Sequence, residues 1–263
     1  MEKNKGLLAG KRGLVMGVAN EKSIAWGIAK VAADEGAKIA FSYQLEGFRK
    51  RLVPLAESIK SDIMIPCDVG VEGSVERCFY ELTKYWSTID FVIHALAFSD
   101  KAELKGQYLH TSPKNFSDTM IISAFSFTEV AFASRQLMSD GGSLLTLSFL
   151  GAKRSVPNYN VMGVAKAALE ASVRYLAVDL GNQGIRVNAL SAGPMRTLAG
   201  AAISGARHIY RHAETNSPLK RNPSLDEVGK AGLYLISDLS SGVTGETHFV
   251  DGGYNTLGIP QEL

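Results

Sequence analysis

Short apolar runs alternate with stretches of helical spacing along nearly the whole chain, and this alternation constrains the fold more than any other feature. Runs typical of strands occupy residues 13–17, 38–42, 62–66, 89–95, 142–148, 185–190 and 247–250. Helical patterns occupy residues 24–35, 45–60, 71–86, 158–180 and 226–237, with a further helix inside 116–138 after a loop over about 97–117. Such alternation predicts a parallel sheet whose right-handed crossovers cover both faces with helices.

The whole chain, residues 1–263, is expected to form one domain, because no repeat or Pro/Gly/Ser-rich linker divides it. This is a single-domain Rossmann-type α/β fold, a doubly wound parallel sheet with helices on both faces. The 28 basic and 26 acidic residues leave a net charge of +2, which gives little attraction to nucleic acid or anionic membranes.

Composition also excludes several other classes. No apolar run reaches the roughly 18 residues of a membrane span, and the charged N-terminus lacks the apolar stretch of a signal peptide. Two cysteines cannot build a disulfide framework or a four-ligand zinc site. We therefore expect a cytoplasmic protein without membrane insertion, a nucleic-acid partner or a metal.

Ligands of doubly wound folds bind at the carboxyl ends of the strands, so the residues that follow each strand are the informative ones. After the first strand, Gly17 and Ala19 are small enough to let backbone N–H groups approach a pyrophosphate. Ser23 is placed either to cap the next helix or to donate to a phosphate. The loop is longer than G-x-G-x-x-G allows, so an ordinary glycine turn with a capping serine is an alternative.

The residues after the second and third strands suggest the adenosine end of a dinucleotide site. Gln44 can hydrogen-bond a ribose hydroxyl, and Glu46 would repel a 2′-phosphate, which favours NADH, although the basic residues at 49–50 lie close in sequence. Asp68 can accept from an adenine amino group or cap the next helix, and Val69 can pack on the ring. Gln44 is alternatively just the polar end of a strand.

Two other reactive side chains read as core residues. His94 lies in the apolar fourth strand, where a lone histidine is more often a satisfied core residue than a catalyst. Cys67 is expected to be a small buried apolar residue.

Tyr159 and Lys166 carry the strongest chemical signal. Residues seven apart on a helix differ by about 700°, so both side chains would share one face, about 10 Å apart along the axis. A tyrosine can donate to a developing oxyanion, and a lysine can hold cofactor hydroxyls and supply positive charge. The alternative is an ordinary surface pair, but the expected helix follows a strand at the binding edge.

The segment after the sixth strand begins with a turn at Gly193-Pro194. Backbone groups there and Thr197 are placed to contact a cofactor, and the small residues at 199–205 are typical of a mobile lid or of a plain connecting loop.

Together these segments resemble the short-chain dehydrogenase/reductase superfamily, and in particular its divergent enoyl-acyl-carrier-protein reductase branch. The resemblance runs from about Gly10 to Gly253 and includes GVANEKSIAWGIA, SYQ, CDV, PNYNVMGVAKAALE, RVNALSAGPMRTLA and GETHFVDGGY. The Tyr-x6-Lys spacing is the discriminating feature, because ordinary members of the superfamily use Tyr-x3-Lys and this chain has Gly163 at that position.

The resemblance implies hydride transfer from NADH to the β-carbon of a trans-2-enoyl thioester in fatty acid elongation. Tyr159 would hydrogen-bond the thioester oxygen, Lys166 would hold the nicotinamide ribose, and Ser99 would lie near the acyl chain. The implied cofactor-binding set is Gly17, Ala19, Ser23, Ile24, Gln44, Asp68, Val69, Leu96, Lys166, Met195, Thr197, Leu198 and Ala199. A substrate lid is expected around residues 195–212.

The chain departs from the family pattern at Phe149, a catalytic position usually occupied by tyrosine, and more mildly at Ala95 and Ala97, where serine and glycine are expected. Phenylalanine fills nearly the same volume, so the pocket should survive while any role of the missing hydroxyl is in doubt.

The resemblance also implies an acyl carrier protein as partner and a homotetramer. Arg207, His208 and Arg211 would form the docking patch for this acidic partner or, as the plainer interpretation, a solvated helix face. Two other functions compete with the reductase: another short-chain oxidoreductase acting on a carbonyl or alcohol, and a non-catalytic NAD-binding regulatory protein.

Overall fold

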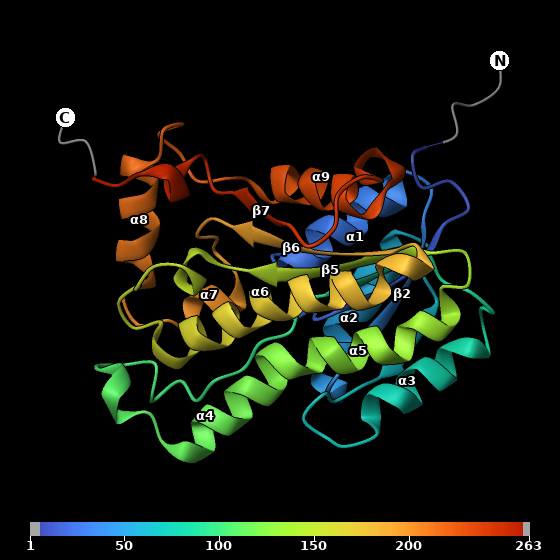
Figure 1. Cartoon of the computed structure of the whole chain (residues 1–263), viewed down its shortest axis with the longest axis horizontal. Helices are drawn as coiled ribbons and strands as arrows, with labels where there is room; N and C mark the ends of the chain where they lie inside the picture. Colours follow the sequence, from blue (N-terminus) through green and yellow to red (C-terminus); the bar gives the residue numbers. More distant parts are fainter. Residues whose placement is uncertain (1–5, 260–263) are drawn as a thin grey trace.

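A computed structural model describes residues 6–259 and contains a seven-stranded parallel sheet in the order β3-β2-β1-β4-β5-β6-β7 (Figure 1). The strands are β1 (Arg12–Met16), β2 (Lys38–Tyr43), β3 (Ile63–Pro66), β4 (Phe91–His94), β5 (Gly142–Ser148), β6 (Ile185–Ala192) and β7 (Thr247–Val250). Neighbouring strands are all parallel, as βαβ crossovers require. The doubly wound sheet expected from the alternating pattern is confirmed.

Helices cover both faces of this sheet. The helices are α1 (Ile24–Asp34), α2 (Glu46–Ser58), α3 (Ser74–Thr83), α4 (Pro113–Met120), α5 (Ser126–Ser134), α6 (Asn160–Leu180), α7 (Leu198–Ala201), α8 (Ala206–Asn216) and α9 (Leu225–Ile236). One core contains side chains of α3, α5 and α6, and the other contains side chains of α1, α2 and α9. Figure 1 shows α1 and α9 on one side of the sheet and α5 and α6 on the other. No helix of residues 6–259 is long and apolar enough to cross a membrane.

The strand order reverses between β1 and β4, which is where doubly wound folds bind ligands. Met16 is in register with Ser42 on one side and with His94 on the other, so three strands end at the same edge. β5 and β6 continue this edge with Ser148 opposite Ser191. The segments that the sequence singled out therefore meet along one side of the sheet.

The loop expected to extend to about residue 117 ends earlier, because α4 begins at Pro113. Ser112 accepts a hydrogen bond from the backbone of Asn115 at 3.2 Å, and proline occupies the first turn, which are the two usual signals of a helix start. The helix expected inside 116–138 is divided by a π-helical turn, Ile121–Phe125, into α4 and α5. Pro54 lies inside α2 without ending it.

The expectation that Tyr159 belongs to the long helix is wrong. Tyr159 occupies the position before α6, and its neighbours Asn158 and Asn160 have φ angles of 61° and 44°. Because the left-handed region interrupts a right-handed helix, the helical-wheel argument does not apply across Asn160. The actual placement of Tyr159 depends on this local bend and on the contacts described below.

Candidate active site

The turn between β1 and α1 is closed by a serine side chain. Ser23 Oγ accepts hydrogen bonds from the backbone N–H groups of Ala19 at 3.0 Å and Asn20 at 3.1 Å, and it makes no capping bond to α1. Of the two roles expected for Ser23, helix capping is therefore wrong. The hydroxyl proton is not used by these bonds and can be donated to a phosphate, while Ile24 begins the helix and is half-buried.

Gly17 lies where the ends of β1 and β4 come together. Its φ is +96°, and a Cβ atom at this position would lie 2.7 Å from the carbonyl carbon of Ala95 and 3.2 Å from Leu96 Cδ2. Glycine is required both by the backbone conformation and by this close approach. Gly17 and Leu96, both expected to bind the cofactor, are thus brought together at this edge of the sheet.

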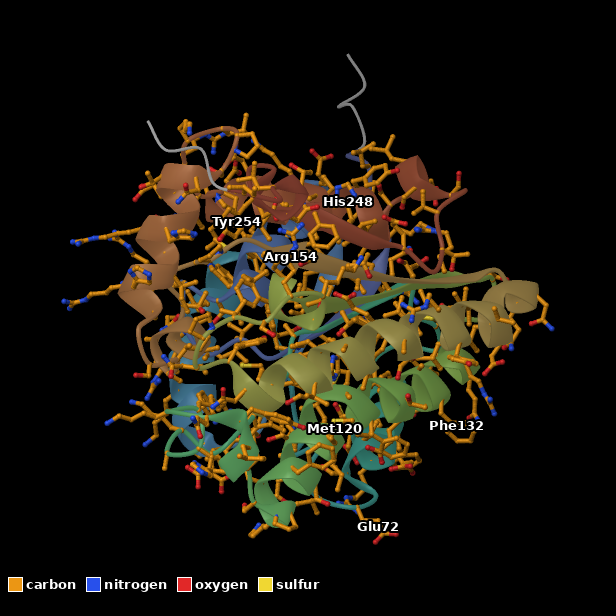
Figure 2. The ribbon with its side chains drawn as sticks, turned by 60° about the vertical axis from the view of Figure 1, so that its left-hand side comes forward. Glu72, Met120, Phe132, Arg154, His248 and Tyr254 are labelled. Carbon is orange, nitrogen blue, oxygen red and sulfur yellow. The ribbon has the colours of Figure 1, made fainter. Side chains whose placement is uncertain are left out.

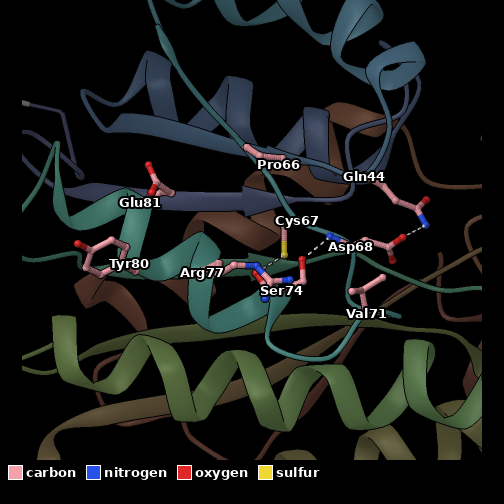
Figure 3. Close-up of a pocket in the computed structure, with 9 residues that line it drawn as sticks. All are labelled: Gln44, Pro66, Cys67, Asp68, Val71, Ser74, Arg77, Tyr80 and Glu81. Carbon is pink, nitrogen blue, oxygen red and sulfur yellow. Dashed lines mark hydrogen bonds between the residues drawn. The ribbon is translucent and has the colours of Figure 1, made fainter.

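The ends of β2 and β3 line a pocket of about 490 Å³. Gln44 Nε2 donates to Asp68 Oδ2 at 3.1 Å (Figure 3). The second oxygen of Asp68 accepts from the N–H of Gly70 at 2.9 Å. The residue before α3 is Gly73, so the expectation that Asp68 caps this helix is wrong. The pocket is lined by Gln44, Pro66, Cys67, Asp68, Val71, Ser74, Arg77, Tyr80 and Glu81.

Val69, expected to pack on adenine, is 8% exposed and belongs to the core, so it offers little surface to a ring. The basic residues near Gln44 are partly engaged elsewhere: Arg49 pairs with Glu46 at 3.0 Å and lies over the Tyr43 ring. The charge closest to Gln44 is thus the carboxylate of Asp68, which disfavours an added phosphate at this end.

Tyr159 is buried beside the end of β5. Its ring meets the edge of Phe149 with 5.1 Å between centroids, and Leu104 and Met162 pack around it. Burial, together with the negative charge of Glu170, raises the pKa of Tyr159 well above its usual range. The phenol therefore keeps its proton at neutral pH and is available as a hydrogen-bond donor.

Two asparagines fix the bend that carries Tyr159. Asn158 Nδ2 donates to the carbonyl of Ser204 at 3.0 Å, and Asn160 Nδ2 donates to the carbonyl of Glu103 at 3.2 Å. These bonds tie the start of α6 to the long loop after β4 on one side and to the expected lid on the other. Asparagine tolerates the left-handed conformation better than most residues, which explains the N-Y-N sequence.

Lys166 is 6% exposed on the face of α6 that packs against the sheet. Its Nζ donates to the carbonyl oxygen of Leu147 at 2.8 Å. Burial lowers the pKa of Lys166 to about 8, although the carboxylate of Glu170 acts in the opposite direction. The expectation of a solvated surface pair is wrong for both residues, because Tyr159 is only 7% exposed.

His94 is a core residue, as the sequence indicated. It is fully buried between two hydroxyls, with Nδ1 3.0 Å from Thr146 Oγ1 and Nε2 2.9 Å from Ser126 Oγ. Burial lowers the pKa of His94 to about 3, so the ring is neutral near pH 7. Cys67 is likewise buried.

The substrate side is less enclosed. Ser99 is half-buried, and its Oγ donates to Asn115 Oδ1 at 3.2 Å. Met195 packs on the core, whereas Leu198 and Ala199 are exposed. Thr197 caps the short helix α7 by accepting from the N–H of Gly200 at 2.9 Å.

The helix that follows the expected lid carries the three basic side chains assigned to docking. Arg207, His208 and Arg211 are all exposed on α8, at one side of the molecule (Figure 1). This geometry is compatible with a docking patch and with a solvated face.

Sequence reasoning missed a buried polar layer next to Lys166. Ser148 Oγ donates to Glu170 Oε1 at 2.7 Å, and both residues are buried. Ser191 lies opposite Ser148 in the sheet, and within residues 6–259 its buried hydroxyl has no hydrogen-bond partner. The signal was available, because Glu170 falls one helical turn after Lys166, on the same face.

Comparison with known proteins identifies the family of this chain. Residues 17–255 match the family model described as enoyl-(acyl carrier protein) reductase. A Rhizobium meliloti (strain 1021) protein named enoyl-[acyl-carrier-protein] reductase [NADH] 2 is 59% identical over 255 residues, covering 97% of this chain and 95% of its own length.

Two crystal structures are also similar to this chain. FabI from Candidatus Liberibacter asiaticus is 55% identical with a TM-score of 0.96, covering 97% of this chain and 99% of that one. The reductase from Anaplasma phagocytophilum, solved in complex with NAD, is 55% identical with a TM-score of 0.95, covering 99% of both chains.

Proposed function

Because this chain belongs to the enoyl-(acyl carrier protein) reductase family, we propose that it reduces trans-2-enoyl thioesters of acyl carrier protein with NADH, using Tyr159 and Lys166. The family, the fold and the class of enzyme inferred from the sequence are confirmed by relatives that match almost its entire length. The observation that carries the assignment of roles is the burial of a protonated tyrosine and a buried lysine at the carboxyl edge of the sheet.

NADH, when bound, supplies the hydride for the β-carbon of the substrate. As that carbon is reduced, negative charge develops on the thioester oxygen at the other end of the conjugated system, and a proton from solvent at the α-carbon completes the reduction. Tyr159 donates its hydroxyl proton in a hydrogen bond to this oxygen, and its raised pKa keeps the proton in place between turnovers. Lys166 holds the ribose hydroxyls and contributes positive charge near the tyrosine.

The residues present fit a dinucleotide. Gly17 and the backbone of Ala95 leave a narrow gap that a side chain would fill, and Ser23 has a hydroxyl proton to donate at the start of α1. Gln44 and Asp68 form a polar, negatively charged adenosine end, which favours NADH over NADPH. We expect Met195, Thr197, Leu198 and Ala199 to border the nicotinamide when residues 195–212 close as a lid.

The decisive experiment is NADH oxidation by the purified protein with a trans-2-enoyl coenzyme A thioester, beside a Tyr159→Phe variant. Removing one oxyanion donor costs about 10²–10³-fold in kcat. NADH binding, measured by fluorescence, should be unchanged in the variant. Binding of NADH without reduction of any enoyl thioester would instead support the non-catalytic alternative, and turnover of carbonyl substrates would support the other oxidoreductase.

The acyl carrier protein is the expected macromolecular partner, and the family implies a homotetramer in the cytoplasm. Exposed apolar side chains support self-association: Phe125 in the π-helical turn and Phe132 on α5 lie seven residues apart, and Tyr175 and Val178 are exposed on α6 (Figure 2 labels Phe132). Light scattering should give the mass of four chains, and a monomer would contradict the tetramer.

A further inference from the structure

Glu170 is a buried carboxylate for which stability gives no reason. It is 4% exposed on α6, one turn after Lys166, and one of its oxygens accepts from Ser148 at 2.7 Å. Lys166 is anchored on the preceding residue of the same strand, through the carbonyl of Leu147. Adjacent residues of β5 thus hold the lysine and the glutamate side by side beneath the site.

The side chains between this end of β5 and α6 are polar. Ser148 and Ser191 are register partners, so their side chains point to the same face of the sheet, toward α6. Taking a carboxylate out of water is costly unless it meets an opposite charge or hydrogen bonds. A layer that contains Glu170 and a Ser191 hydroxyl with no hydrogen-bond partner among residues 6–259 therefore needs an explanation other than packing.

We propose that Glu170 is a positioning residue for the reaction: its buried carboxylate, held by Ser148, keeps the Lys166 ammonium charged and in place to bind the ribose. The inference rests on the proposed function, because it assumes that Lys166 holds the cofactor. Glu170 does so without an ion pair to Lys166, since no ion pair with a nitrogen–oxygen distance of 4 Å or less joins them in residues 6–259. The negative charge of Glu170 acts on the Lys166 ammonium across one turn of α6.

The other titratable groups around Lys166 cannot replace Glu170. Tyr159, at the start of the same helix, keeps its proton because its pKa is raised. His94, which faces Lys166 from β4, is neutral because its pKa is lowered to about 3. Glu170 is thus the negative group that opposes the burial of Lys166, whose pKa is about 8.

The negative charge of Glu170 determines the direction in which the pKa of Lys166 should change. Neutralising Glu170 removes the interaction that raises the pKa of Lys166, so the lysine loses its proton at lower pH. In Glu170→Gln the alkaline limb of kcat/KM for NADH should therefore move down by about one to two pH units, which is the effect of a charge about 6 Å away at an effective dielectric constant of about 20. Glutamine still accepts from Ser148, so the hydrogen bond remains.

The test measures the pH profile of kcat/KM and, separately, the Kd of NADH at neutral and alkaline pH. Glu129→Gln is the matched control, because Glu129 is a half-buried carboxylate on the neighbouring α5. Glu129→Gln should keep the profile of the unmodified protein, and Glu170→Asp should restore it even if kcat falls. A Glu170→Gln enzyme with lower activity but an unshifted profile and an unshifted pH dependence of Kd would overturn the proposal.

A second variant covers the case in which Glu170→Gln does not fold. Ser148→Ala keeps the carboxylate but releases it, and it should shift the same limb in the same direction by a smaller amount; an unchanged limb would overturn the anchoring role. Failure of the proposed function is distinguishable, because the unmodified protein would then show no NADH-dependent reduction of the enoyl thioester at any pH.

Discussion

A methyl group at position 151 should displace Tyr159, the proposed hydrogen-bond donor to the substrate. Gly151 lies in the 3₁₀ turn after β5, Leu150–Ala152, and a Cβ atom there would lie 2.6 Å from Tyr159 Cε1 and closer still to Cδ1. Ordinary contacts begin at 3.4 Å, so the ring of Gly151→Ala must move by about 1 Å. A misplacement of about 1 Å can reduce catalysis about 10²-fold, and the overpacking should cost about 1–3 kcal/mol of stability.

The kinetic assay distinguishes a displaced Tyr159 ring from a loss of folded protein. Steady-state NADH oxidation with an enoyl thioester should show a kcat about 10²-fold below that of the unmodified protein, while the Kd of NADH changes little, because Gly151 is remote from the adenosine end of the site. Gly181→Ala is the matched control: its backbone is helical, and nothing lies within 4 Å of the added carbon. A Gly151→Ala enzyme within about threefold of the unmodified kcat would refute the argument that the ring position limits catalysis.

Three further predictions concern other parts of the chain. Phe149→Tyr should fold normally, because the ring already packs edge-on against Tyr159, and an unchanged kcat/KM would show that the hydroxyl is dispensable here. The pKa of His94 is lowered to about 3 in the folded protein, whereas an unfolded histidine has a pKa of about 6.5. The unfolded state therefore binds the extra proton, and the free energy of unfolding should fall as the pH drops from 6.5 toward 3. Chemical denaturation of His94→Gln should show a weaker pH dependence over that range. Reversing Arg207 and Arg211 to glutamate should raise KM for a substrate on acyl carrier protein and leave KM for a coenzyme A thioester unchanged, whereas equal effects on both substrates would contradict the docking patch.

The strands were the easiest part of this fold to predict, because buried parallel strands are nearly continuous apolar runs. The runs expected at 142–148 and 247–250 coincide with β5 and β7. Helix ends were harder: α4 begins with a Ser-Pro signal that was not used, and α6 begins one residue after Tyr159. Both errors are local, because caps and left-handed residues are decided by side-chain contacts that periodicity does not contain.

Residues that directly follow a strand could be singled out from the sequence. Contacts between segments that are far apart in the sequence could not. Gly17 was singled out because it follows a strand whose end the topology brings to this edge, whereas the role of Leu96 was implied by the family resemblance. The link between Asn158 and Ser204 spans 46 residues, and no local pattern indicates it. The helix-capping role considered for Ser23 was excluded only by the hydrogen bonds that it makes to its own loop.

Packing alone does not explain why Lys166 and Glu170 are buried. A hydrophobic pair of the same size would pack between α6 and the sheet without the cost of desolvating two charges, as the core formed by Leu169 and Val173 one turn away does. The chain instead places two charges where they can act on Tyr159 and on a ligand at the strand ends. Such a cost in stability is expected where residues serve function rather than packing. Replacing both charged residues by apolar ones should therefore stabilise the fold and abolish NADH-dependent reduction.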